Sequence, residues 1–169
     1  AGARGQSPRG LALRQRRIRR NISMLKNYHL HFEFWGLALF LAMMIPTLIW
    51  SVIPAPNDIL RTEDAAGAFD MAVSLLRIWM IAALCILRNR KAGEPRLNAL
   101  TIAAAACCLL YFTSWIFYYI GAAGPTVILG LTLPPCLAFL LFAIDRKNGI
   151  ALLPALAFTA CHLFSSLQK

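Results

Sequence analysis

The stretch of sequence that decides the fold is residues 97–144, LNALTIAAAACCLLYFTSWIFYYIGAAGPTVILGLTLPPCLAFLLFAI. It contains two apolar segments joined by a short turn at 121–125, and neither segment contains Lys, Arg, Asp or Glu. Each segment is about as long as the roughly 20 apolar residues that a helix needs to cross a bilayer. A soluble protein of 169 residues is too small to bury both segments. The stretch therefore predicts a helical hairpin that crosses a membrane.

The composition of the whole chain agrees with a membrane protein. Hydrophobic residues make up 59% and charged residues 14%, whereas soluble domains average about 25% charged residues. The net charge of +10 is concentrated before the first apolar segment and in one later loop. Because the basic arm stands directly before a predicted span, its expected partner is anionic lipid and not nucleic acid. The residues expected to contact lipid head groups are Arg16, Arg17, Arg19, Arg20, Lys26, Arg88, Arg90 and Lys91.

The chain divides into an N-terminal arm, residues 1–23, and one domain, residues 24–169. The arm is rich in Arg, Gly and Ala and lacks Lys, Asp and Glu, and the composition changes at Met24. Two readings stay open for the arm. It is either a disordered basic arm of the native protein, or an extension in front of a native start at Met24.

The domain contains five apolar segments, at 34–53, 68–87, 98–120, 126–144 and 150–167. They predict an all-α integral membrane bundle with five transmembrane helices. Pro46 lies inside the first segment, where a proline frees the backbone carbonyl near Ala42 and kinks the helix. The third segment contains small residues in its first half and aromatic residues in its second half. Small residues let helices approach closely, and the aromatic half suits a membrane interface.

The distribution of Lys and Arg among the loops predicts the orientation. The N-terminal arm, the loop 88–96 and the turn 145–149 are basic, whereas the loop 55–67 has one Arg and the turn 121–125 has none. Basic loops stay in the cytoplasm. We therefore expect a multi-pass protein of a bacterial cytoplasmic membrane, with its N-terminus cytoplasmic and its C-terminus outside.

One arginine lies in the middle of an apolar segment and marks the candidate ligand site. Arg77 at the middle of a span is costly, so it should face the bundle or a wet cavity. Its functional reading is an anchor for an anion or carboxylate; its structural reading is a residue that snorkels or pairs, for example with Asp70 through water. Pro134 and Pro135 interrupt a span near the depth of His162, and broken helices line binding sites in many transporters. These residues, Arg77, Pro134, Pro135 and His162, predict one polar pocket near the midplane.

The sequence does not predict a metal, a cofactor or a catalytic residue. The five cysteines lie inside apolar segments without Cys-x-x-Cys spacing, which disfavours a disulfide framework or a redox pair. Three of the thiols and His162 lie at similar depths, yet their spacing matches no metal motif. His29, His31 and Glu33 share a face only if that segment is extended. Because no motif of a known catalytic class is present, an enzyme is the less favoured reading.

The leading functional hypothesis is a small transporter or ligand-binding membrane protein with a pocket at Arg77. The alternative is a structural or regulatory subunit, or a homo-oligomer, that docks a partner through the small residues Ala103 and Ala106. The two hypotheses differ in whether replacing Arg77 or replacing the alanines abolishes function.

Two short segments carry a resemblance. Residues 50–60, WSVIPAPNDIL, and residues 133–139, LPPCLAF, resemble segments of small uncharacterised multi-pass membrane proteins of Firmicute-type bacteria, and the resemblance covers about residues 24–167. It implies a multi-pass fold and no activity. In size and span count the chain is also similar to the tryptophan-rich sensory protein family, but it lacks that family's proline- and tryptophan-rich motifs.

Overall fold

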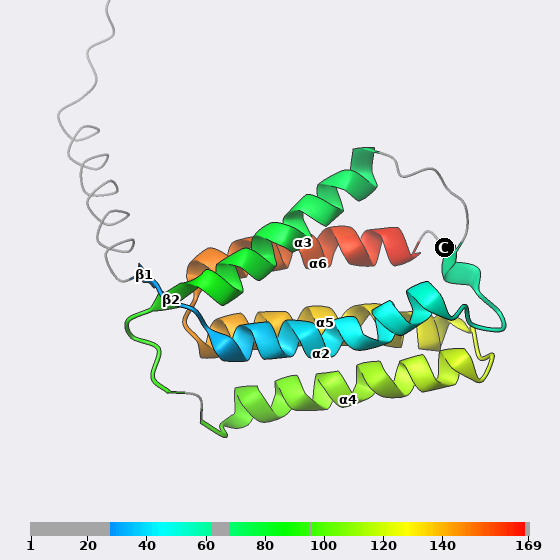
Figure 1. Ribbon diagram of the computed structural model, residues 1–169, viewed down its shortest axis with the longest axis horizontal. Coiled ribbons are helices and arrows are strands. Elements are labelled where there is room, and N and C mark those ends of the chain that lie inside the picture. The colour runs from blue at the N-terminus through cyan, green and yellow to red at the C-terminus, as the bar shows by residue number, and fades with distance from the viewer. Residues whose placement is uncertain (1–27, 62–67, 95, 168–169) are drawn as a thin grey trace, which may run out of the picture.

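The computed structural model describes residues 28–61, 68–94 and 96–167, and this part of the chain forms a helical bundle with a short β-ribbon at one end (Figure 1). The arm 1–23 and the predicted head-group contacts from Arg16 to Lys26 lie outside the described residues. A single 3₁₀ turn, η1 (Ile59–Arg61), follows the first helix. The five α-helices are α2 (Phe34–Val52), α3 (Ala68–Ile86), α4 (Ala99–Tyr119), α5 (Pro125–Asp145) and α6 (Gly149–Leu167).

These helices confirm the five predicted apolar segments, and every helix end lies within one residue of its predicted boundary. Helices α2, α4 and α5 are each long and apolar enough to cross a membrane. The apolar stretches described for the other two helices, Met71–Ile86 and Gly149–Phe164, are shorter. The predicted hairpin of residues 97–144 is thus a pair of helices suited to a membrane, whereas the crossing of all five helices stays a prediction.

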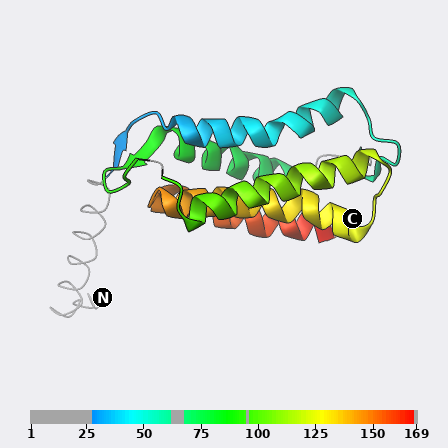
Figure 2. The same cartoon turned by 90° about the horizontal axis from the view of Figure 1, so that it is seen from below.

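Short turns force neighbouring helices to run antiparallel. The chain reverses between α4 and α5 at Gly121, whose φ of 99° is a conformation that glycine adopts without strain. It reverses again between α5 and α6, where the Asn148 side chain accepts a hydrogen bond from the Ala151 amide and caps α6. In the bundle, α4 packs along α5, α3 packs along α6, and α2 lies over α3 (Figure 2).

The half of the bundle next to the ribbon is tightly packed. Its interior positions on α3, α5 and α6 carry small side chains, and a β-carbon at Gly36 of α2 would stand only 2.9 Å from the Leu84 carbonyl oxygen of α3. Small residues let helix backbones approach closely where no water is present to be expelled. The alanines buried in this half are Ala83, Ala138, Ala143, Ala151 and Ala155.

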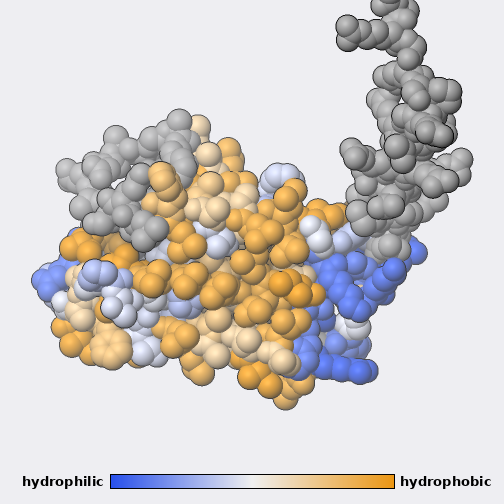
Figure 3. All heavy atoms as spheres, turned by 180° about the vertical axis from the view of Figure 1, so that it is seen from behind, coloured by the Kyte–Doolittle hydropathy of each residue, from blue (hydrophilic) through white to orange (hydrophobic). Residues whose placement is uncertain are grey.

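The surface separates an apolar belt from a polar end (Figure 3). Large apolar side chains are exposed on all five helices, for example Leu48, Trp79, Leu109, Leu137 and Leu153. At the ribbon end the described residues include six basic side chains, Arg88, Arg90, Lys91, Arg96, Arg146 and Lys147, against three acidic ones, Glu33, Glu94 and Asp145. A soluble protein rarely exposes so continuous an apolar surface. The belt therefore agrees with a lipid environment for this bundle.

The ribbon itself was not predicted. Strand β1 (Tyr28–Leu30) pairs antiparallel with β2 (Leu87–Asn89), with Tyr28 opposite Asn89 and Leu30 opposite Leu87. The Tyr28 hydroxyl accepts a hydrogen bond from the Gly149 amide at 2.9 Å, and this contact joins the ribbon to the start of α6. Leu87, expected at the end of a helix, is instead the first residue of β2.

Candidate functional site

A cavity of about 370 Å³ lies among the five helices in the half of the bundle opposite the ribbon. Its size falls within the range of small-molecule sites, roughly 300–1,000 Å³. Most of the lining is apolar, aromatic or sulfur-bearing. The polar or hydrogen-bonding side chains that line it are Thr47 and Trp50 of α2, Arg77 of α3, Tyr111 and Trp115 of α4, Thr132 of α5 and His162 of α6.

Three of the four predicted ligand-binding residues line this cavity. Arg77, Pro135 and His162 come from different helices and border the same space. Pro134 is buried in α5 but is not among the lining residues. The Asp70 side chain, a possible partner of Arg77, lies outside the described part of the structure. The structure thus brings Arg77, Pro135 and His162 together, and their role in binding stays a prediction.

The Arg77 guanidinium is held by an aromatic ring. Its central carbon lies 5.5 Å from the centroid of the Phe158 ring, and Phe158 stacks on His162 with centroids 5.1 Å apart. A cation over an aromatic face is attracted by the ring's negative π-cloud. Within the described residues, Arg77 makes no ion pair, and no Asp or Glu lines the cavity. Among the described residues, the charge of Arg77 in this cavity has no acidic counterpart.

Trp115 adds a hydrogen-bond donor that the described residues do not satisfy. Its side chain is only 7% exposed, and the indole N–H has no acceptor among them. Edge-to-face contacts with Tyr111 and Tyr118 hold the ring, with centroids 6.3 and 5.7 Å away. A buried donor without a partner costs about 1–3 kcal/mol, so such groups commonly mark a water or ligand position.

The aromatic half of α4 has a buried side and an exposed side. Tyr111, Trp115 and Tyr118 are buried inside the bundle, whereas Ile116 and Phe117 are exposed. The position of this half at a membrane interface stays a prediction. The Tyr111 hydroxyl donates to the Met43 carbonyl at 3.1 Å, one residue from the carbonyl expected to be freed by Pro46. The sequence did not identify Tyr111 or Trp115, because α4 is apolar on every side.

The chain segment after α2 covers the end of the cavity that lies farthest from the ribbon. Trp50 donates its indole N–H to the Asp58 carboxylate at 3.0 Å, and the Tyr118 hydroxyl donates to Asp58 at 2.9 Å. The Leu60 amide donates to the same hydroxyl at 3.2 Å, and the Leu60 side chain lines the cavity. Asp58 therefore fastens this segment to α2 and α4.

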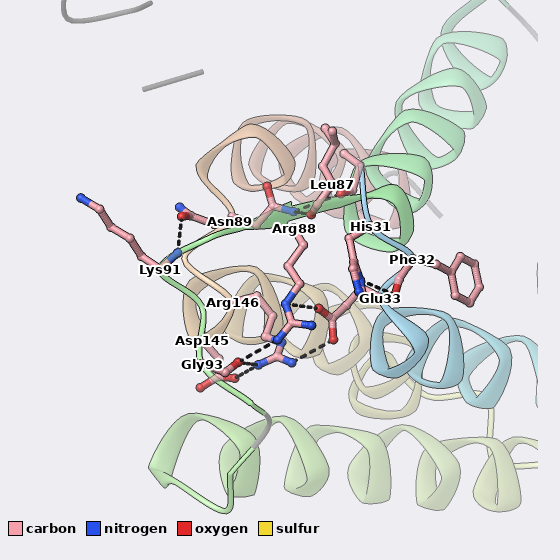
Figure 4. A network of polar contacts seen from close by, with 12 residues as sticks. His31, Phe32, Glu33, Leu87, Arg88, Asn89, Lys91, Gly93, Asp145 and Arg146 are labelled. Atoms are coloured by element: carbon pink, nitrogen blue, oxygen red, sulfur yellow. Dashed lines mark hydrogen bonds and ion pairs between the residues drawn. The ribbon is translucent and has the colours of Figure 1, made fainter. Parts of the chain in front are cut away.

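A second polar cluster closes the ribbon end (Figure 4). Glu33 is 5% exposed; its carboxylate accepts a hydrogen bond from Arg146 at 2.8 Å and lies 3.6 Å from the Arg88 Nε. Arg146 also donates to the Gly93 carbonyl at 3.0 Å. Of the predicted head-group contacts, Arg90 and Lys91 are exposed, whereas Arg88 is half-buried beside Glu33.

The remaining candidates do not form a metal site. The five cysteines are free thiols. In the part of the chain that the structure describes, no three His, Cys, Asp or Glu side chains lie close enough together to hold a metal ion. On α4, Ala103 is half-buried and Ala106 is exposed, so a docking role for that face stays a prediction.

No family model, curated protein or solved structure matches this chain. The resemblance to small multi-pass membrane proteins therefore stays a prediction, and the function has to be argued from the site itself.

Proposed function

We propose that this protein is a five-span membrane protein that binds a lipophilic carboxylate inside its helix bundle. One observation carries the proposal. Among the described residues, Arg77 is the one formally charged side chain that lines the cavity, and no Asp or Glu lines it. A cation in an apolar bundle is costly, and an anionic ligand would compensate it.

The chemistry of the lining narrows the ligand class. Arginine donates through a planar fork that matches a carboxylate, and the Trp115 N–H supplies one further donor. Phe40, Met43, Met80 and Phe139 supply apolar walls. A ligand with one carboxylate on an apolar or aromatic body fits this combination better than a sugar or a polyanion.

Binding fits the geometry better than transport. The cavity lies in the half of the bundle away from the ribbon, while buried alanines such as Ala138 and Ala155 fill the other half. The Glu33–Arg146 pair closes the same end. A transporter would have to open this packed half to release its substrate on the second side.

The binding test uses a matched pair of probes. 2-Naphthoate carries a carboxylate on an aromatic body, and 2-naphthamide is its neutral analogue. With the purified protein in lipid nanodiscs, we expect naphthoate to bind more tightly, as measured by quenching of Trp115 and Trp50 fluorescence. Arg77→Gln should weaken naphthoate binding by about tenfold or more, because a hydrogen bond to a charged group contributes about 1.5–3 kcal/mol. Naphthamide binding should change little.

The control variant is Arg96→Gln, which removes a positive charge from an exposed residue at the ribbon end. It should leave both affinities unchanged. Equal binding of the two probes to the unmodified protein, or equal loss in the two variants, would contradict the proposal.

The five-span topology needs its own test. We infer that all five helices cross the membrane with the ribbon end in the cytoplasm, supported by exposed apolar side chains on every helix and by the basic excess at that end. Alkaline phosphatase fused after Lys169 should be active, and green fluorescent protein fused there should be dark. The reverse pattern would exclude an outside C-terminus.

A further inference from the structure

We propose that the ribbon end of the bundle contains a second binding site, specific for a phosphate group. The site is a cleft of about 430 Å³ lined by His29, His31, Arg88, Asn89, Arg90 and Ala92. It is separate from the carboxylate cavity, whose lining shares none of these residues.

The register of the ribbon gathers the basic side chains of the cleft on one face. His29 pairs with Arg88 across the two strands, so their side chains point to the same side. His31 and Arg90, each one residue beyond the end of its strand, line the same cleft. The opposite face carries Tyr28, whose hydroxyl is bonded to the start of α6. The ribbon therefore contacts the bundle through Tyr28 on one face and through Arg88, beside Glu33, on the other face.

Among the described residues, Arg90 of this cleft has no acidic partner, whereas Arg88 pairs with Glu33. No Asp or Glu lines the cleft. Glu33 lies 3.6 Å from Arg88 and 2.8 Å from Arg146, and Asp145 lies 4.0 Å from Arg146, so two carboxylates serve these two guanidinium groups. Figure 4 shows Arg88 and Arg146 converging on Glu33 from two different segments. An added anion would compensate the charge of Arg90, and arginine forks match phosphate oxygens.

The two imidazoles supply further groups for the ligand. Nδ1 of His29 is buried and has no hydrogen-bond partner among the described residues. Nδ1 of His31 lies 2.9 Å from the Phe32 carbonyl oxygen, which only accepts hydrogen bonds, so this nitrogen carries the proton and Nε2 is left for a ligand. The ring centroids are 5.6 Å apart, close enough for one group to contact both.

The position of the cleft favours a phosphate group that lies in the lipid head-group region. Leu30, Phe32, Phe34 and Trp35 beside the ribbon are all more than half exposed, and they continue the apolar belt up to the basic face. Exposed aromatic side chains at the edge of an apolar belt are typical of the head-group region, where lipid phosphates lie. A soluble phosphate ester carries the same recognition chemistry, so the test separates the two sources.

The test compares two neighbouring charges. Arg90 lines the cleft, whereas Lys91 is exposed and does not. Binding is measured by isothermal titration calorimetry of the full chain in uncharged detergent at fixed salt. The probes are dioctanoyl phosphatidic acid, dioctanoyl phosphatidylcholine and glycerol 3-phosphate. We expect phosphatidic acid to bind, Arg90→Gln to weaken it about tenfold, and Lys91→Gln to weaken it less than about twofold.

The outcomes separate a site from general surface charge. Binding of phosphatidic acid alone identifies a lipid phosphate, and binding of glycerol 3-phosphate as well identifies the phosphate group as sufficient; both support the site. Equal weakening by the two substitutions, equal binding of phosphatidylcholine, or binding of no probe overturns it. His29→Asn provides a second variant, which should also weaken binding while the thermal unfolding temperature stays unchanged.

Discussion

At the scale of single residues, the hydroxyl of Tyr111 joins α4 to the backbone of α2 next to a proline. Pro46 lacks an amide hydrogen and disturbs the hydrogen bonds of α2 one turn before it. Tyr111 donates to the Met43 carbonyl, and the Thr47 hydroxyl lies 3.1 Å from the same Tyr111 oxygen. In an apolar surrounding, a carbonyl without a partner is costly. Tyr111 therefore fixes the shape of α2 beside the cavity.

Tyr111→Phe is expected to lower the free energy of unfolding by about 1–2 kcal/mol, because the buried hydrogen bond to the Met43 carbonyl is lost. Thermal unfolding of the purified variant in detergent measures this loss. Tyr119→Phe is the control, since its hydroxyl bonds the Ile53 carbonyl in an exposed position, where water replaces the lost bond. An equal loss in both variants would contradict a special role for Tyr111.

From the sequence, the charged residue, the proline and the histidine of the cavity can be predicted, but the aromatic residues that line it cannot. Arg77 is visible because a charge inside an apolar run must find a polar surrounding. Pro135 and His162 are visible for similar reasons, and all three line the cavity. Trp115 is not, because a helix that is apolar on every side does not reveal which face points inward. Only the packing of α4 against its neighbours decides this.

At the scale of elements, the sequence predicts the helices almost completely and the ribbon not at all. Apolar length and flanking turn residues are local signals, and they place every helix end within one residue. Tyr28 pairs with Asn89, which lies 61 positions later in the chain, and each of the two strands is only three residues long. No local propensity encodes such a contact. The basic cleft was missed for the same reason.

The segment after α2 behaves as a cover that depends on one carboxylate. Asp58→Ala removes the acceptor for both Trp50 and Tyr118. We expect faster hydrogen–deuterium exchange in residues 53–61 and no change at the ribbon end, since the fastening is local. Glu94→Ala, which removes an exposed carboxylate at the opposite end, should leave the exchange of 53–61 unchanged. Exchange that rises equally throughout the protein would indicate global destabilisation instead.

At the scale of the whole molecule, the ends of the bundle are built differently. The ribbon end is tied together by Glu33, Arg88 and Arg146, which come from three segments far apart in the chain. The opposite end relies on Asp58 and on aromatic side chains around the cavity. The ribbon end is thus held by ion pairs, and the opposite half of the bundle contains the cavity.

The Glu33–Arg146 ion pair at the ribbon end leads to a prediction about stability. Glu33→Gln leaves Arg146 charged and buried, and the free energy of unfolding should fall by about 3–5 kcal/mol. Arg146→Gln should cost a similar amount. The double variant Glu33→Gln/Arg146→Gln should lose less than the sum, because neither charge then stays buried alone. Chemical unfolding of the four proteins gives the coupling energy, and strictly additive losses would exclude a direct interaction.

The alanines packed between the cavity and the ribbon affect which side of the membrane could supply a ligand to the cavity. A chamber that is sealed at its floor equilibrates with one compartment only, because a molecule leaves through the opening by which it entered. Under the proposed binding function, the filling of such a chamber follows the ligand concentration in that compartment, and the protein would report this concentration through its helices.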